Sequence, residues 1–151
     1  MIAERVFLMI IKQLSIFVEN KRGRLAEITE LLHEAQIDIR ALCIADTKNF
    51  GILRLIVDDP DKAEKVLKEN DCTVSLTNVL TIRIDDQPGG LATPMKLLSD
   101  YDISVEYMYA FISKDVNSAY VILRVDDNDK AIEVFQKNDV TMVSAEEIYN
   151  M

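Results

Sequence analysis

Two short stretches of the sequence decide the fold: DDQPGGLATPMKLL at residues 85–98, and ENKRGRLAEITELL 66 residues earlier, at residues 19–32. In both, an apolar, alternating segment ends in acidic residues, and a glycine follows, with a leucine two residues after it. The leucine opens an amphipathic segment with helical spacing. Glycine permits tight turns because it has no Cβ. A strand-to-helix turn that occurs twice in one short chain indicates an internal duplication.

The duplication extends well beyond the two turns. LSIFVENKRGRLAEITELL (residues 14–32) aligns with LTIRIDDQPGGLATPMKLL (residues 80–98), and ILRLIVDDPDKAEKVLKEND (residues 52–71) aligns with YVILRVDDNDKAIEVFQKND (residues 120–139) at an offset of 68. We therefore predict an N-terminal extension at residues 1–11 that leads into the first strand, repeat 1 at residues 12–76, repeat 2 at residues 78–147, and a C-terminal tail at residues 148–151. Met9 is an alternative start, which would make residues 1–8 a dispensable extension.

Each repeat is expected to contain six elements in the order strand, helix, strand, strand, helix, strand. Residues 14–19 alternate like a half-buried strand, residues 37–45 and 51–57 form a hairpin around a polar turn at 46–51, and short strands at 73–76 and 141–144 close the two repeats. Asp59 and Asp127 are predicted to cap the second helices. This βαββαβ order predicts an α+β, ferredoxin-like unit with an antiparallel sheet and both helices on one face. Units of this size are marginal alone, so we expect them to join side by side into an eight-stranded sheet.

Composition excludes several classes of function. The 151 residues are 49% hydrophobic and 28% charged, which is typical of a packed globular chain, and the net charge of −9 argues against a nucleic-acid surface. Cys43, Cys72 and the single histidine, His33, cannot assemble a zinc site, and no cofactor is expected. The apolar stretch VFLMII at residues 6–11 is too short for a signal peptide or a membrane helix, so we expect a cytoplasmic protein with no membrane partner.

The duplicated turn has the chemistry of an amino-acid site. Backbone N–H groups at a helix N-terminus attract an anion such as a carboxylate. Asp85 and Asp86 could receive an ammonium group by charge-assisted hydrogen bonds, and Asn20 is the corresponding neutral acceptor in repeat 1. The alternative is that Gly23 and Gly89 only form a tight turn.

The turn and the element order around it resemble the ACT domain, a small-molecule-sensing module of amino-acid metabolism. The family turn Asp/Asn-x-Pro-Gly-x-Leu is matched by Asp86-Gln-Pro88-Gly89-Gly-Leu91, and by Asn20-Lys-Arg22-Gly23-Arg-Leu25 with Arg in place of Pro. Asp38 and Ser104 stand where the family often has a ligand-contacting Asn. The ligand-binding residues that the turn chemistry and the resemblance predict are Asp86, Pro88, Gly89, Gly90, Leu91, Asn20, Gly23, Arg24, Leu25, Asp38 and Ser104.

The resemblance implies a tandem pair that binds an amino acid or related carboxylate at the seam between its units and signals its occupancy to a partner metabolic enzyme, without catalysis of its own. The Asp-containing turn of repeat 2 is expected to be the first ligand-binding site, and the more basic turn of repeat 1 could favour a more acidic ligand. Two alternatives remain: a subunit that assembles with an enzyme without sensing, and a small acyl-phosphate hydrolase, for which Arg22 and Arg24 could cradle phosphate in repeat 1 only. The aromatic run EYMYAF at residues 106–111 indicates core packing or an interface, including a homodimer.

Overall fold

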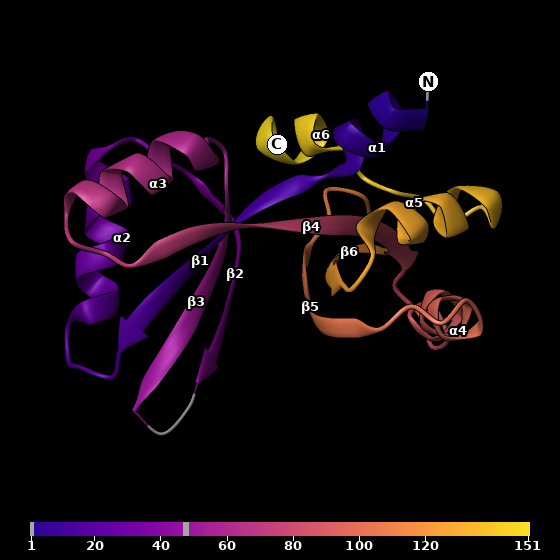
Figure 1. Cartoon of the computed structure of the whole chain (residues 1–151), viewed down its shortest axis with the longest axis horizontal. Coiled ribbons are helices and arrows are strands. Elements are labelled where there is room, and N and C mark those ends of the chain that lie inside the picture. The colour runs from indigo at the N-terminus through magenta and orange to yellow at the C-terminus, as the bar shows by residue number, and fades with distance from the viewer. Residues whose placement is uncertain (1, 47–48) are drawn as a thin grey trace. The chain divides into compact units, whose positions relative to one another are not determined.

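The computed structural model describes residues 2–46 and 49–151, and the hairpin turn predicted at residues 46–51 lies partly outside this range. The chain folds as two compact units. The first unit contains Lys12–Thr77 and Ile148–Met151, and the second contains Asn78–Glu147 together with the N-terminal residues up to Ile11. Each unit holds one copy of the repeat. Figure 1 shows the elements of both units, coloured along the chain.

The first unit has the element order expected for a ferredoxin-like fold. Its elements are β1 Ile11–Glu19, α2 Arg24–Glu34, β2 Ile39–Asp46, β3 Phe50–Val57, α3 Pro60–Glu69 and the beginning of β4 Val74–Asp85. The strands are ordered β2-β3-β1-β4. Pairing of β1 with β3 and of β2 with β3 is antiparallel. The α+β fold class is thus confirmed for this unit.

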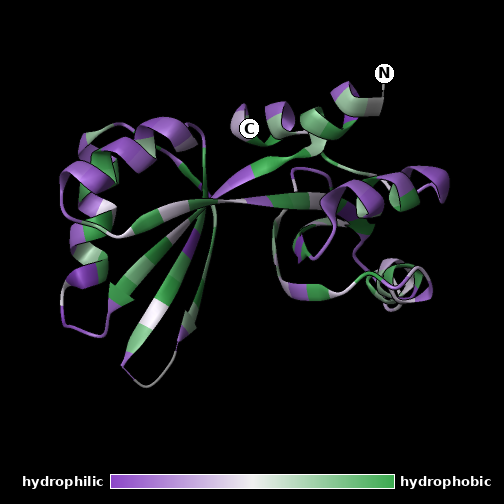
Figure 2. Cartoon of the chain, in the orientation of Figure 1, coloured by the Kyte–Doolittle hydropathy of each residue, from purple (hydrophilic) through white to green (hydrophobic). Residues whose placement is uncertain are grey.

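Helices α2 and α3 cover one face of the first unit's sheet (Figure 1). Ile28 and Leu32 of α2 pack with Ala63 and Leu67 of α3 against the inward side chains of β1 and β3. The helices carry hydrophobic residues toward the strands and hydrophilic residues on their outer surface (Figure 2). Alternation along β1, with Leu14, Ile16 and Val18 buried, supplies the other side of this core. The helices and the sheet therefore stabilise one another by burying a shared apolar layer.

The second unit repeats the arrangement. It contains β4 from Asn78 onward, α4 Ala92–Asp100, β5 Val105–Ile112, β6 Ser118–Val125 and α5 Asn128–Lys137. Its strands are ordered β4-β6-β5 with antiparallel pairing throughout. Leu98, Ile132 and Phe135 of the helices are buried against Leu80, Ile82 and Leu123 of the strands, among others. The two copies thus build the same core from different side chains.

The structure differs from the predicted eight strands in two places, and six strands are present within the described residues. The last strand of repeat 1 and the first strand of repeat 2 are one element, β4. The strand expected at residues 141–144 is reduced to an isolated bridge between Ile82 and Met142. It ends early because Ser144 accepts a hydrogen bond from the Glu147 N–H and so opens a short helix, α6 Ala145–Tyr149.

Both terminal segments have defined positions within the units. Residues expected only to lead into the first strand form helix α1 Ile2–Met9, which contacts α5 in the second unit. Val6, Met9 and Ile10 pack against that unit's core. In the first unit, the Tyr149 hydroxyl accepts a hydrogen bond from the Lys12 N–H (2.9 Å), and the Tyr149 carbonyl accepts one from Arg40 (3.0 Å). The two ends of the chain are therefore packed in different units.

Candidate functional site: the duplicated turn and its hollows

The two strand-to-helix turns have the same backbone hydrogen bonds. The Asp86 N–H donates to the carbonyl of Asn117 (2.8 Å), and the Asn20 N–H donates to that of Asn49 (3.4 Å). Two further bonds of each turn match at an offset of 66: Gln87 N–H to Asp85 O and Gly90 N–H to Gln87 O in repeat 2, and Lys21 N–H to Glu19 O and Arg24 N–H to Lys21 O in repeat 1. The predicted duplication of the turn is therefore also present in its conformation.

Glycine is needed at one equivalent position of both turns. Gly23 has φ 85° and Gly89 has φ 90°. This left-handed region is strained for residues with a Cβ. No side chain caps the N-terminus of α2 or α4, so neither turn uses a side chain to satisfy the first N–H groups of its helix. Backbone carbonyls satisfy some of these groups, since the Arg24 N–H donates to Lys21 and the Thr93 N–H donates to Gly89, and Pro94 has no N–H. The N–H groups that remain are the donors available to an anion.

The turns differ at the residue after this glycine. In repeat 1 this residue is Arg24, the first residue of α2, whereas in repeat 2 it is Gly90, and α4 begins only at Ala92. A Cβ at Gly90 would overlap the carbonyl oxygen of Asp85. The backbone of the second turn is thus packed more closely onto the end of β4, and only glycine fits there.

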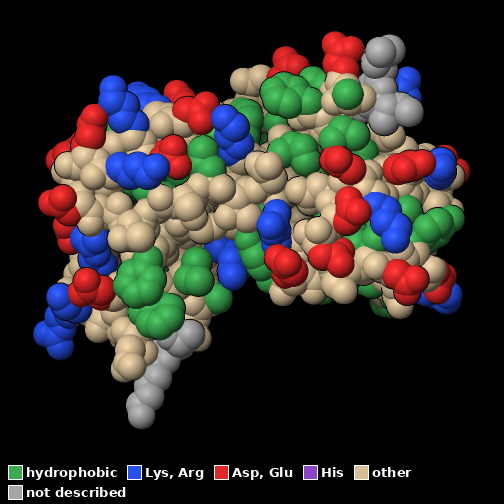
Figure 3. All heavy atoms as spheres, viewed as in Figure 1, with side chains coloured by type: hydrophobic (Ala, Val, Ile, Leu, Met, Phe, Trp, Pro, Cys, Tyr) green, Lys and Arg blue, Asp and Glu red, His purple; other side chains and the backbone are tan. Residues whose placement is uncertain are grey.

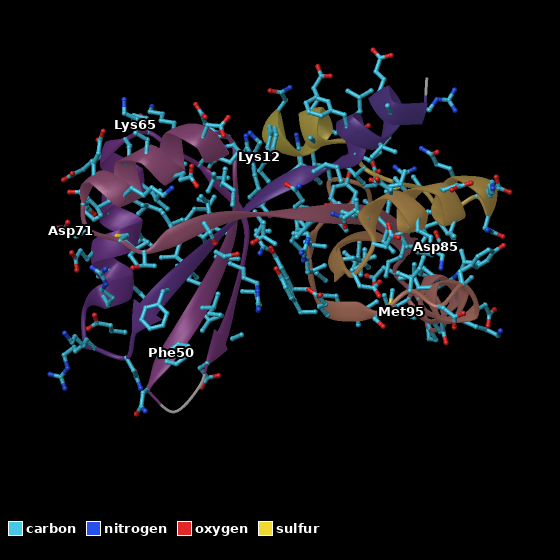
Figure 4. The ribbon with its side chains drawn as sticks, in the orientation of Figure 1. Lys12, Phe50, Lys65, Asp71, Asp85 and Met95 are labelled. Carbon is cyan, nitrogen blue, oxygen red and sulfur yellow. The ribbon has the colours of Figure 1, made fainter. Side chains whose placement is uncertain are left out.

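A hollow of about 430 Å³ lies beside the second turn, entirely within the second unit. It is formed by the end of β4, the turn, the first residues of α4 and the segment at 139–141. Its lining residues are Arg83, Ile84, Asp85, Gln87, Pro88, Gly89, Gly90, Thr93, Pro94, Asp139, Val140 and Thr141. Figure 4 labels Asp85, at the end of β4, and Met95, which lies on α4.

Of the five residues predicted in the second turn, three line this hollow: Pro88, Gly89 and Gly90. Asp86 and Leu91 do not line it. The adjacent Asp85 does, and together with Asp139 it supplies the carboxylates of the lining. Arg83 is the basic residue of the lining, and its guanidinium is paired with Asp115 at 2.9 Å. Near the start of α4, the N–H groups of Gln87, Gly90 and Thr93 in this lining donate to backbone carbonyls. The hollow therefore combines the Gly89 N–H of the turn with carboxylates from two segments.

A smaller hollow of about 160 Å³ lies beside the first turn, on the side of the β2–β3 hairpin. Among the predicted residues, Asn20, Arg24 and Leu25 line it, and Gly23 does not. The remaining lining residues are Val18, Glu19, Lys21, Ile44, Asp46, Phe50 and Gly51. The Lys21 ammonium lies 2.7 Å from the Glu19 carboxylate and lowers the pKa of that exposed group. The hollow beside the first turn is thus smaller than the one beside the second turn, and an internal ion pair lies in its lining.

The Arg24 side chain turns back onto its own unit. Its guanidinium pairs with Glu27 (2.9 Å) and donates to the Cys72 Sγ (3.8 Å), and its side chain is only 21% exposed. The Glu27 hydrogen bond raises the pKa of Arg24, with the nearby Cys72 sulfur as a smaller contribution, against the opposing effect of burial. This arginine is therefore held by protein partners, which leaves fewer of its donors for an acidic guest.

Asp38 and Ser104 line neither hollow. Their backbone N–H groups donate to Asp58 (3.0 Å) and Asp126 (3.1 Å), an equivalent pair of bonds at the starts of β2 and β5. The Asp38 carboxylate also accepts a 2.6 Å hydrogen bond from Arg40. Within its own unit, each of these two predicted residues is part of the hydrogen bonding at the start of a strand.

Sequence reasoning missed Thr93 and the segment at 139–141. Thr141 reaches the hollow because its carbonyl accepts a hydrogen bond from the Arg83 N–H (2.8 Å). Alignment of the repeats gives no signal for this segment, because the corresponding residues 71–73 of repeat 1 do not line the hollow beside the first turn. In the described part of the chain, no group of three or more His, Cys, Asp or Glu side chains is placed to hold a metal ion. No helix there is long and apolar enough to cross a bilayer.

Charge on the molecular surface is mixed. Figure 3 shows acidic and basic side chains interspersed on the visible face, without a continuous basic area.

Comparison with known proteins identifies solved structures that are similar to this chain. A protein of Bacteroides thetaiotaomicron, BT0572, has a solved structure that is similar to this chain, with 46% sequence identity, coverage of 95% of this chain and 98% of that chain, and a TM-score of 0.90. The ligand-free regulatory subunit of aspartate kinase from Thermus thermophilus matches with 12% identity over 86% of this chain and 92% of that chain, at a TM-score of 0.58. The corresponding subunit from Thermus flavus matches with 14% identity, the same coverage and a TM-score of 0.55.

None of the curated proteins matches this chain. The two regulatory subunits, at these identities, show the fold alone. A family model described as the ACT domain pair matches residues 9–151, which include both repeats and both turns. The chain is therefore a member of the ACT domain pair family.

Proposed function

We propose that this protein binds a small molecule, in the first instance an amino acid, at the duplicated turns and transmits its occupancy to a partner metabolic enzyme. The observation that carries the proposal is the second turn. It places an uncapped helix N-terminus and the carboxylates of Asp85 and Asp139 around one hollow of about 430 Å³. Membership of the ACT domain pair family supports a regulatory role. A cytoplasmic location is part of the proposal.

The chemistry of the second turn suits a zwitterion. A ligand carboxylate would accept a hydrogen bond from the Gly89 N–H of the turn, near the start of α4, where the helix dipole also favours a negative charge. A ligand ammonium group would donate to a carboxylate of the lining, with Asp85 the nearest to the turn in sequence. Binding would change the partner enzyme only to the extent that the ligand prefers one conformation of the pair over another.

The proposal is tested by thermal-shift measurements on the full chain with each of the twenty amino acids at millimolar concentration. At least one should raise the melting temperature, and calorimetry should then give a dissociation constant. The variants Asp85→Ala and Asp86→Ala distinguish the roles of the two acidic residues. The lining of the hollow predicts the larger loss of binding affinity for Asp85→Ala, whereas the sequence motif alone predicts it for Asp86→Ala. Asp129→Ala, an exposed acid at the start of α5, is the matched control. If no amino acid or related carboxylate binds, the sensing proposal fails.

A further inference from the structure

The two repeats hold the segment that follows their second helix in the same way. The Cys72 N–H donates to the Leu67 carbonyl (3.0 Å), and the Val140 N–H donates to the Phe135 carbonyl (3.0 Å). The Phe17 N–H donates to Thr73 (2.9 Å), and the Arg83 N–H donates to Thr141 (2.8 Å). Cys72 and Val140 are therefore structurally equivalent, and each lies at the equivalent position beside the strand-to-helix turn of its repeat.

In repeat 1, the Arg24 side chain fills the space between the turn and Cys72. The guanidinium of Arg24 lies between Glu27 and Cys72, at 2.9 Å and 3.8 Å. The equivalents of these three residues in repeat 2 are Gly90, Thr93 and Val140, and all three line the hollow of about 430 Å³. Repeat 2 therefore has an open space where repeat 1 holds an arginine side chain.

The charged residues that line the open space of repeat 2 suit a guanidinium group like that of Arg24 in repeat 1. Arg83, the basic residue of its lining, is paired with Asp115. The ion pairs formed among the described residues do not include Asp85 or Asp139, which come from two segments of the hollow's lining, one on β4 and one after α5. A cation entering from solvent would find two carboxylate partners without displacing an existing ion pair.

We propose that the hollow of repeat 2 binds a ligand with a guanidinium group on a flexible arm, of the size and chemistry of an arginine side chain. Arg24 of repeat 1 is the internal counterpart of this ligand. A guanidinium ligand would enter between Thr93 and Val140 and donate to Asp139 and Asp85. Repeat 1 is then closed to the same ligand, because its own arginine occupies the equivalent place. The inference rests on the proposed function for the identity of the site and adds the ligand class.

Calorimetric titration of the full chain with arginine, agmatine and citrulline tests the inference. Agmatine keeps the guanidinium and lacks the α-carboxylate, while citrulline keeps the α-amino acid group and replaces the guanidinium by a neutral ureido group. We expect arginine and agmatine to bind and citrulline to bind at least about tenfold more weakly, since it loses a charge-assisted interaction. Asp139→Asn should weaken the binding of agmatine about tenfold or more, because it also removes a charge-assisted interaction.

Asp71→Asn is the matched control. Asp71 is the repeat 1 equivalent of Asp139, and the two have nearly the same backbone, with φ 61° and 58°, which Asn tolerates. Equal loss of agmatine binding in both variants, or citrulline binding equal to that of arginine, would overturn the inference. If agmatine does not bind while another amino acid does, the inference fails and the proposed function stands. If agmatine binds and no amino acid does, the hollow is a cation site and the amino-acid function fails.

Discussion

Gly90 lies so close to the carbonyl oxygen of Asp85 that a Cβ at position 90 would overlap this oxygen. The equivalent residue of repeat 1, Arg24, begins helix α2 and carries a long side chain. This position of the duplicated turn is therefore restricted to glycine in repeat 2, whereas it carries a long side chain in repeat 1. The hollow beside the second turn lies where this side chain is missing.

Gly90→Ala is expected to destabilise the second unit by about 1–3 kcal/mol, because the obstructing atom is backbone and must shift. Gly89→Ala should also cost stability, through strain at φ 90° with free space around the Cβ. Urea unfolding curves measure both variants. Arg24→Gly, which makes repeat 1 resemble repeat 2 at this position, is the reciprocal variant. Unchanged stability in Gly90→Ala would contradict the close packing of the turn.

Asp59 and Asp127 provide a second matched pair. Each accepts a hydrogen bond from the backbone three residues on, at Lys62 (3.2 Å) and Lys130 (3.0 Å). Replacing either by Ala should lower the free energy of unfolding by about 1 kcal/mol, as is usual for the loss of an N-cap. Asp129→Ala is the control, since this acid stands in the first turn of α5 without capping it. Equal effects for Asp127→Ala and Asp129→Ala would show that only helix-dipole charge matters.

Much of this architecture follows from sequence, because the duplication repeats turn residues whose roles are local. Gly23 and Gly89 both have the positive φ that a strand-to-helix glycine allows, and Asp59 and Asp127 both cap as their spacing indicates. These features depend on a few neighbouring residues. They can be read without knowing the tertiary structure.

The composition of the hollow could not be read in this way. Asp139 and Thr141 lie more than 40 residues from the turn in sequence, and they reach it through tertiary hydrogen bonds such as that from the Arg83 N–H to the Thr141 carbonyl. The obstruction of Gly90 by Asp85 likewise depends on the backbone path of the folded turn. The fusion of two predicted strands into β4 was missed because short strands were expected from each repeat separately, although no turn sequence interrupts residues 74–85.

Helix α1 gives a prediction about the N-terminal segment. Val6 packs against the core of the second unit, whereas its neighbour Phe7 is 77% exposed. Val6→Ala should destabilise the second unit by about 1 kcal/mol, and Phe7→Ala should have little effect. Hydrogen exchange localises the change, which should appear as faster exchange in α5, the helix that α1 contacts. Unchanged exchange in α5 of the Val6→Ala variant would contradict the packing of α1 against this unit.

Tyr149 predicts a pH dependence of the first unit. Burial raises the pKa of its hydroxyl, while the hydrogen bond from the Lys12 N–H opposes this shift. The folded state therefore keeps the Tyr149 proton at a pH where the unfolded chain has lost it. The resulting stability is fully present below about pH 10, the ordinary pKa of tyrosine, and is lost as the pH rises through the raised pKa.

Tyr149→Phe should remove this part of the alkaline decline in the free energy of unfolding. It should also cost about 1 kcal/mol at neutral pH, since it leaves the Lys12 N–H without its acceptor. Urea unfolding between pH 8 and about 11 measures both effects. Tyr101→Phe, at a 44% exposed tyrosine, is the control and should keep the wild-type slope. A wild-type slope in Tyr149→Phe as well would show that this buried hydroxyl does not govern alkaline stability.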